Sequence, residues 1–158
     1  LYANVNFDST RRQGGEAEID WQIAGPLSAR LAYAYTEATF RSGANAGKQL
    51  PLVAPHSGSL QLNWDAGSAG RYTVVANAVG ERHYSGDFAH QRKSLAGYTR
   101  VDLQAEWKLT QWSLNLALLN ALDKRYSPFA GYSTSISDYY YYPADGRSLR
   151  LTARYDFK

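Results

Sequence analysis

The side chains best suited to binding a ligand lie in two stretches of the chain that carry no strand pattern. The longer stretch, 121–146, is dense in rigid aromatic rings with polar tips, which can stack on a planar or catecholate ligand. These rings are Phe129, Tyr132, Tyr139, Tyr140, Tyr141 and Tyr142. The same rings would also suit packing between loops or an aromatic belt at a membrane surface, so both interpretations stay open here.

The second stretch, 81–96, is basic and contains two imidazoles. Arg82, Arg92 and Lys93 can attract an anionic chelate, and His83 or His90 can offer a nitrogen to haem iron. The three histidines of the chain, including His56, lack the close spacing of a metal site. Solvated loop histidines are the simpler interpretation, and we expect no resident metal and no cofactor.

The sequence shows no catalytic constellation. It has no cysteine, and its serine, histidine and aspartate residues form neither a nucleophile elbow nor a recognisable triad order. No glycine-rich phosphate loop follows a strand. The 17 basic and 14 acidic residues are scattered, without the charged block of a nucleic-acid-binding arm. We therefore expect neither an enzyme nor a nucleic-acid partner.

The elements that must position these loops are strands with strict alternation. From Ser148 to Phe157 the chain is apolar at every odd position and polar at every even one, so the two kinds of side chain lie on opposite faces. Similar patterns predict eight strands. These lie at about 1–7, 15–23, 27–39, 57–65, 71–80, 100–109, 112–118 and 148–157. The mean hydropathy of −0.47 fits strands that expose only alternate residues to lipid.

The connections between these strands fall into two kinds. Residues 24–26, 66–70 and 110–111 form tight turns, 40–56, 81–96 and 121–146 are long, and 8–14 is intermediate. Short and long links alternate, which is typical of outer-membrane barrels with short periplasmic turns and long external loops. The pattern predicts an all-β, transmembrane, antiparallel up-and-down β-barrel segment.

Aromatic residues provide a second indication of a membrane. All four tryptophans lie on apolar faces within about three residues of a short turn, as expected for a girdle at one membrane interface. The predicted girdle consists of Trp21, Trp64, Trp107, Trp112, Tyr155 and Phe157. The opposite faces carry too many charges to be buried dry, so they need water or charged partners.

Three segments carry a family resemblance. Asn120–Tyr126 reads NALDKRY, and PADGRSLRLTARYDF follows from Pro143; both are similar to the C-terminal end of TonB-dependent outer-membrane receptors. Arg12–Trp21, RQGGEAEIDW, and Leu50–His56 resemble earlier parts of the same barrel. The resemblance covers nearly the whole chain.

The resemblance implies a location and a function. Residues 1–158 would be the C-terminal part of a receptor barrel, about eight strands of about 22, without its plug domain. The parent receptor would lie in the outer membrane of a Gram-negative bacterium, bind a ferric siderophore or similar metal chelate, and import it with energy from TonB. Its partners would be membrane lipid, its own plug, TonB through the missing N-terminal part, and the chelate.

The resemblance also gives the inward charges a partner. The residues that would face the plug are Arg100, Asp102, Glu106, Arg150 and Arg154. A hydrated network of ion pairs between strands explains the same residues. The alternative for the whole chain is a complete eight-stranded outer-membrane barrel that acts as an anchor or adhesin. A soluble binding sandwich ranks third, because tryptophans exposed at one level argue against it.

Overall fold

A computed structural model describes residues 9–157 of the chain. Its strands are β1 (Thr10–Ala24), β2 (Leu27–Phe40), β3 (His56–Asp65), β4 (Arg71–Val79), β5 (Tyr98–Lys108), β6 (Trp112–Leu119), β7 (Phe129–Ser133), β8 (Asp138–Tyr142) and β9 (Ser148–Tyr155). A short 3-10 turn, η1 (Gly67–Ala69), joins β3 to β4. The expected strand at 1–7 lies outside the described residues. Within those described, no helix has the length and apolar character needed to cross a membrane.

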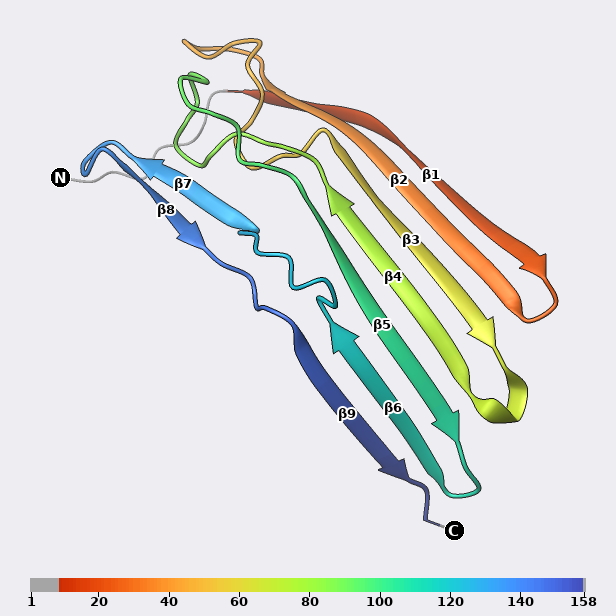
Figure 1. Cartoon of the computed structure of the whole chain (residues 1–158). Coiled ribbons are helices and arrows are strands. Elements are labelled where there is room, and N and C mark those ends of the chain that lie inside the picture. Colours follow the sequence, from red (N-terminus) through yellow and green to blue (C-terminus); the bar gives the residue numbers. More distant parts are fainter. Residues whose placement is uncertain (1–8, 158) are drawn as a thin grey trace.

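Seven of the strands form one antiparallel sheet in the order β1-β2-β3-β4-β5-β6-β9, and β7 and β8 form a separate hairpin. Neighbours in the sheet come in chain order, with only the β7–β8 hairpin inserted between β6 and β9, so the expected up-and-down order is confirmed. Figure 1 shows all short turns at one end of the sheet and all long loops at the other. The short and the long connections therefore lie at opposite ends of the strands, as the sequence predicts.

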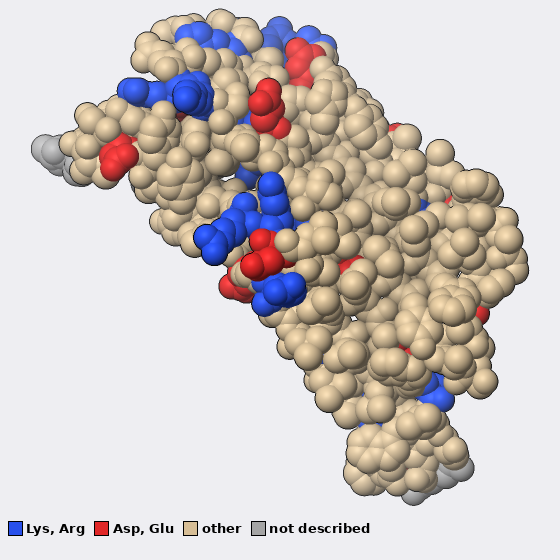
Figure 2. Space-filling model, in the orientation of Figure 1, with Lys and Arg blue, Asp and Glu red and all other residues tan. Residues whose placement is uncertain are grey.

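The pairing register gathers the apolar residues into rows on one face. Leu31 pairs with Leu60, while Leu118 lies between Leu103 on β5 and Leu149 on β9. These side chains have no second layer over them, and Leu149 is 69% exposed. Figure 2 shows this face, where charged atoms are scarce over the strands. An apolar face left open in this way needs an apolar medium to cover it.

The packed core of the described chain lies among the long loops. One cluster joins Ala38, Phe40 and Leu50, and a second joins Tyr84, Leu95 and Ala130. Both clusters lie at the long-loop end, where residues from the end of β2 and from β7 pack against residues of the loops. The loops are therefore ordered by their own hydrophobic contacts, while the sheet is held mainly by its hydrogen-bonded ladders.

Two sequence expectations were wrong about where strands run. The predicted connection 8–14 is largely strand, because β1 starts at Thr10 and pairs with β2 up to Phe40. The predicted loop 121–146 contains the hairpin β7–β8. Alternation failed to reveal β8 because Asp138–Tyr142 carries rings on both of its faces. A run of tyrosines shows no polar side from which a strand period can be recognised.

Candidate ligand-binding surface

The β7–β8 hairpin brings the predicted aromatic residues together and divides them between two faces. Phe129 pairs with Tyr142, and Tyr132 pairs with Tyr139. Because cross-strand partners share a face and successive residues alternate, Phe129, Tyr140 and Tyr142 lie on one side. Tyr132, Tyr139 and Tyr141 lie on the other. The two sets meet different surroundings.

The second set packs against the loop between β4 and β5. The ring of Tyr84 lies 4.9 Å from that of Tyr139 and 6.1 Å from that of Tyr141, and its hydroxyl is 3.3 Å from the Tyr141 hydroxyl. Burial raises the pKa of Tyr84 to about 12, and the contact with Tyr141 adds to the effect. The Arg92 guanidinium lies 3.8 Å from the centre of the Tyr132 ring. This face of the hairpin serves packing between loops.

The first set remains open to solvent. Phe129, Tyr140 and Tyr142 are 38%, 36% and 61% exposed, and the ring centres of Phe129 and Tyr142 are 5.3 Å apart. Gly131, the cross-strand partner of Tyr140, has no side chain, and the Tyr140 ring occupies the space where one would lie. The hairpin therefore presents a short row of three exposed rings, and the paired backbone of β7 and β8 fixes their positions.

Arg82 joins the two long loops that the sequence singled out. It is 4% exposed, and its guanidinium donates hydrogen bonds to the carbonyl oxygens of Ser127 and Pro128 at 3.1 and 2.9 Å. It also lies 5.7 Å from the centre of the Tyr98 ring. In this structure the charge of Arg82 faces backbone carbonyls, while the exposed basic residues of the loop include Arg92 and Lys93.

His83 and His90 form a stacked pair within the same loop. Their rings are 3.6 Å apart and inclined by 5°. Burial lowers the pKa of His83, and the neighbouring His90 lowers it further. His90 contacts the Gln49 carbonyl oxygen at 2.9 Å through Nε2, and the Leu52 amide donates to the His83 carbonyl oxygen. The pair thus ties this loop to the β2–β3 loop.

His56 lies apart from that pair. It starts β3, where its Nδ1 is 2.7 Å from the Tyr33 hydroxyl on β2. Across residues 9–157, no three histidine, aspartate or glutamate side chains come together as metal ligands would.

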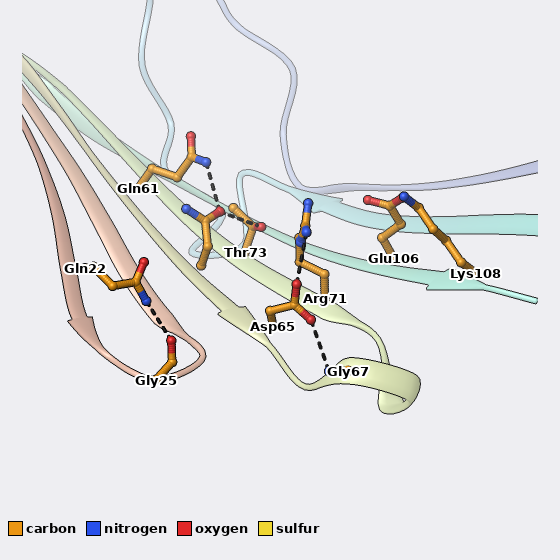
Figure 3. Close-up of polar contacts among 10 residues, drawn as sticks. Gln22, Gly25, Gln61, Asp65, Gly67, Arg71, Thr73, Glu106 and Lys108 are labelled. Atoms are coloured by element: carbon orange, nitrogen blue, oxygen red, sulfur yellow. Dashed lines mark hydrogen bonds and ion pairs between the residues drawn. The ribbon is translucent and has the colours of Figure 1, made fainter.

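The polar face of the sheet carries ion pairs. Arg30 and Asp20 pair at 2.6 Å across β1 and β2, and Arg71 and Asp65 pair at 3.0 Å across β3 and β4. Figure 3 shows the second pair beside the turn amide of Gly67, which donates to Asp65 at 3.0 Å. All of these side chains are about half exposed or more. The face is arranged for a wet lumen.

The five predicted plug-facing residues all lie on this polar face of β5 and β9. Arg100 contacts Asp102 at 2.8 Å, while Glu106 is 3.9 Å from Lys108 and Arg154 is 3.0 Å from Asp156. Arg150 lies opposite Ala117. Four of the five residues thus have a partner of opposite charge nearby on the same face. The Arg154 side chain nevertheless stays 76% exposed.

Asp102 has a structural task that the sequence did not indicate. Its side chain is 6% exposed and accepts a hydrogen bond of 2.8 Å from the Asn120 amide. The buried Asn120 side chain in turn bonds the backbone of Lys124 and Asp145. This network fixes the start of the segment leading to β7. The sequence offers only the residue type at 120: Asn tolerates a positive φ better than most residues, and the φ of Asn120 is 49°.

The predicted girdle residues form an aromatic band beside the short turns, with two groups of rings in contact. Trp64 stacks on Tyr72 at 5.4 Å, and Tyr72 meets Trp107 edge to face at 6.3 Å. Further along, Tyr155 lies 4.9 Å from Trp112 and 4.7 Å from Phe157. Trp21 extends the band on β1 and is 61% exposed. The rings lie on the apolar face at the short-turn end.

Comparison with known proteins identifies the family. The sequence model described as TonB dependent receptor-like, beta-barrel matches residues 1–121. The ferric yersiniabactin uptake receptor FyuA of Yersinia pestis aligns over 94% of this chain and 24% of its own, with a TM-score of 0.79 and 21% identity. The siderophore receptor PiuA of Acinetobacter baumannii aligns over 91% and 21%, with a TM-score of 0.72 and 22% identity.

A third structure, the ferric citrate transporter FecA, gives a TM-score of 0.76 at 16% identity over 94% of this chain and 24% of its own. No curated protein sequence matches the chain. The chain thus spans 21–24% of the length of these solved receptors. The chain belongs to the TonB-dependent receptor family of Gram-negative outer-membrane transport receptors, and its sheet is a segment of that family's transmembrane β-barrel.

Proposed function

We propose that this chain is the C-terminal wall of a receptor that binds a ferric siderophore or a similar metal chelate and imports it with energy from TonB. The observation that carries this proposal is the row Phe129, Tyr140 and Tyr142, held open at the end of the sheet where all the long loops gather. Flat rings at the mouth of a wet barrel suit a planar or catecholate chelate. Arg92, whose guanidinium lies against Tyr132 on the other face of the hairpin, and the adjacent Lys93 would favour an anionic one.

Several features of the sheet support the rest of this assignment. The apolar face and its aromatic band would meet lipid, with the short turns in the periplasm and the long loops outside. The charged face would line the lumen, where Arg150 and the exposed Arg154 would meet a plug domain carried elsewhere in the receptor. TonB would act through that other part of the protein.

The binding proposal is tested in the receptor that carries this segment, purified in detergent. A triple variant, Phe129→Ala with Tyr140→Ala and Tyr142→Ala, is compared with Ile136→Ala, which removes an exposed side chain from the tip of the same hairpin. We expect at least a tenfold weaker affinity for the recognised chelate in the triple variant, since each lost stacking contact contributes about 1 kcal/mol. The probes are ferric catecholate, ferric hydroxamate, ferric citrate, haem and cobalamin.

If the triple variant binds a chelate as tightly as the parent receptor does, the three rings do not contribute to the binding site. Failure of the parent receptor to bind any of the five would reject the chelate class. The domain assignment has its own test, the intact mass of the native protein from outer membranes. A mass several-fold above 17.6 kDa is expected, and a mass near 17.6 kDa would contradict it.

A further inference from the structure

The loop between β4 and β5, residues 81–96, lies between the β2–β3 loop and the β7–β8 hairpin (Figure 1). On the hairpin side, Ser85 lies opposite Gly131 in a parallel bridge. The Ser85 amide donates to the Ala130 carbonyl oxygen at 3.0 Å, and the Tyr132 amide donates to the Ser85 carbonyl oxygen at 2.9 Å. Loop 81–96 therefore runs beside β7 like a very short third strand of the hairpin.

Two buried side chains of the loop add to this hold on the hairpin. Arg82 is 4% exposed and donates hydrogen bonds to the backbone just before β7. Tyr84 is 8% exposed and packs on Ala130 and Tyr139. The hairpin shares no ladder with the seven-stranded sheet, so its placement in the described structure depends largely on loop 81–96.

The other side of the loop is seated on the β2–β3 loop through the two stacked histidines. The Leu52 amide donates to the His83 carbonyl oxygen at 2.9 Å, and Nε2 of His90 lies 2.9 Å from a carbonyl oxygen of the same β2–β3 loop. The two rings lie 3.6 Å apart. Arg82 and Tyr84 flank His83 in the chain, so a displacement of His83 would disturb both contacts with the hairpin.

The surroundings of the His83 ring oppose a positive charge. Its Nδ1 atom is buried and has no hydrogen-bond partner among residues 9–157, and His90 covers one face of the ring. A protonated imidazole donates from both nitrogens, so Nδ1 would become a buried donor without an acceptor. Burial and the neighbouring His90 lower the pKa of His83, and they outweigh Glu81 and Asp87, which act in the opposite direction.

Other charged groups around the pair do little to compensate a proton there. The Asp87 carboxylate already accepts two backbone amides of its own loop, at 2.8 and 3.0 Å. From the β2–β3 loop, the Lys48 ammonium donates to the Ala89 carbonyl oxygen at 3.1 Å and brings a positive charge to this side. Arg82 and Arg92 direct their guanidinium groups to the hairpin, which itself presents tyrosine rings to the loop. Protonation of the pair therefore destabilises the seated loop.

We propose that loop 81–96 is an acid-sensitive latch: a proton taken up by the His83–His90 pair loosens this loop from the β2–β3 loop and thereby loosens the β7–β8 hairpin. The latch is fully stable above pH 6.5, the ordinary value for the opened loop. Below that pH the opened loop binds more protons than the seated loop, so opening becomes more favourable. The loosening of the hairpin depends on these contacts alone, whereas its consequence, weaker chelate binding in acid, rests on the proposed function.

The test measures hydrogen exchange at the Tyr132 amide, which bonds to Ser85 and so reports the hold on the hairpin. The receptor that carries this segment is purified in detergent and compared at pH 7.5 and pH 5.5, after correction for intrinsic rates. We expect protection to fall by about threefold to tenfold in acid. The upper limit applies because one proton is taken up and only the lower of the two pH units lies below 6.5.

His83→Gln is expected to remove this pH dependence. His83→Phe, which keeps a ring against His90 but cannot take up a proton, replaces that variant if it leaves the Tyr132 amide unprotected at pH 7.5. The matched control is His56→Gln, which changes a histidine on β3 and is expected to behave as the parent does. Protection at Tyr132 that is constant with pH in the parent, or that varies equally in the His83 variant, would overturn the proposal.

A further variant separates the histidine pair from the contact with the hairpin. Arg82→Gln removes the hydrogen bonds to the backbone before β7 and leaves the pair in place. We expect the Tyr132 amide to be less protected at both pH values, while the Leu52 amide keeps its dependence on pH. A parent receptor in which Leu52 responds to acid and Tyr132 does not would show that the loop opens without the hairpin, which also overturns the proposal.

Chelate affinity separates this inference from the proposed function. It is measured at the same two pH values with whichever of the five chelates the parent binds, and the parent is compared with His83→Gln so that protonation of the chelate itself cancels. We expect the parent to lose about threefold to tenfold more affinity in acid than the variant. Loosening of the hairpin without this loss contradicts only the proposed role of the aromatic row, and constant protection at Tyr132 contradicts only the latch.

Discussion

At the scale of single residues, one glycine fixes the turn between β3 and β4. Gly70 has a φ of 110°, and a Cβ added there would lie 2.7 Å from the Glu106 carbonyl oxygen. Gly70→Ala therefore meets both a strained backbone and a neighbouring strand, which together cost roughly 1–3 kcal/mol. Gly15→Ala is the control, because nothing lies within 4 Å of its added Cβ.

The measurement is the temperature at which the full receptor loses its heat-modifiable band. We expect several degrees of loss for Gly70→Ala and little change for Gly15→Ala. Equal effects of the two substitutions would mean that neither strain nor contact at Gly70 supports the turn.

The stacked histidines predict a loop that loosens in acid. The pKa of His83 is lowered in the folded loop by burial and by His90, while in the opened loop it returns to the ordinary 6.5. Between these two values the opened loop binds more protons, so the free energy of opening falls as the pH drops below 6.5. The stabilisation is complete above that pH. A single group changes the opening equilibrium by at most about tenfold per pH unit.

Hydrogen exchange at the Leu52 amide, which donates to the His83 carbonyl oxygen, reports this opening. After correction for intrinsic rates, protection is expected to fall from pH 7.5 to pH 5.5. His83→Gln should flatten this dependence, and His56→Gln should preserve it because His56 lies on β3, outside the pair. Protection that stays constant with pH in the parent protein would disprove the coupling.

At the scale of the elements, Asp102 anchors the junction between β6 and β7. Asp102→Ala leaves the Asn120 amide and part of the Arg100 guanidinium without their acceptor, which we expect to cost about 2–4 kcal/mol. Asp156→Ala breaks an ion pair whose partners are 76% and 59% exposed, and such pairs contribute less than about 1 kcal/mol.

Hydrogen exchange at the Lys124 amide, which donates to the Asn120 side chain, measures the local free energy of opening. Faster exchange in the Asp102 variant and unchanged exchange in the Asp156 variant are expected. The opposite order would show that the junction is held by something other than this carboxylate.

The strands show what sequence patterns can predict at this scale. β9 and β5 were predictable because one face meets an apolar medium and the other meets water. Apolar and polar residues therefore alternate along each strand and indicate the face on which they lie. β8 was hidden because its rings are useful on both faces, one for packing on Tyr84 and one exposed. The stacking of His83 on His90 depends on the path of a single loop, and the burial of Arg82 depends on a contact with a distant loop. Neither follows a local sequence period.

At the scale of the whole molecule, the sorting of loops by length predicts which end of the sheet faces the outside of the cell. This segment has no cysteine, so labelling above that of the unsubstituted receptor reports the side of the membrane on which an introduced thiol lies. Ser135 lies at the exposed tip of the β7–β8 hairpin, and Ser68 lies in the exposed short turn η1 at the opposite end. In the receptor that carries this segment, Ser135→Cys should react with a membrane-impermeant maleimide on intact cells.

Ser68→Cys should react only after the outer membrane is opened, because the short turns would face the periplasm. The two thiols are equally simple substitutions at exposed serines, so their difference reports sidedness and not reactivity. Labelling of Ser68→Cys on intact cells would show that the sheet has the opposite orientation, with the aromatic row in the periplasm. The chelate-binding proposal depends on this orientation, and this one comparison would reject it.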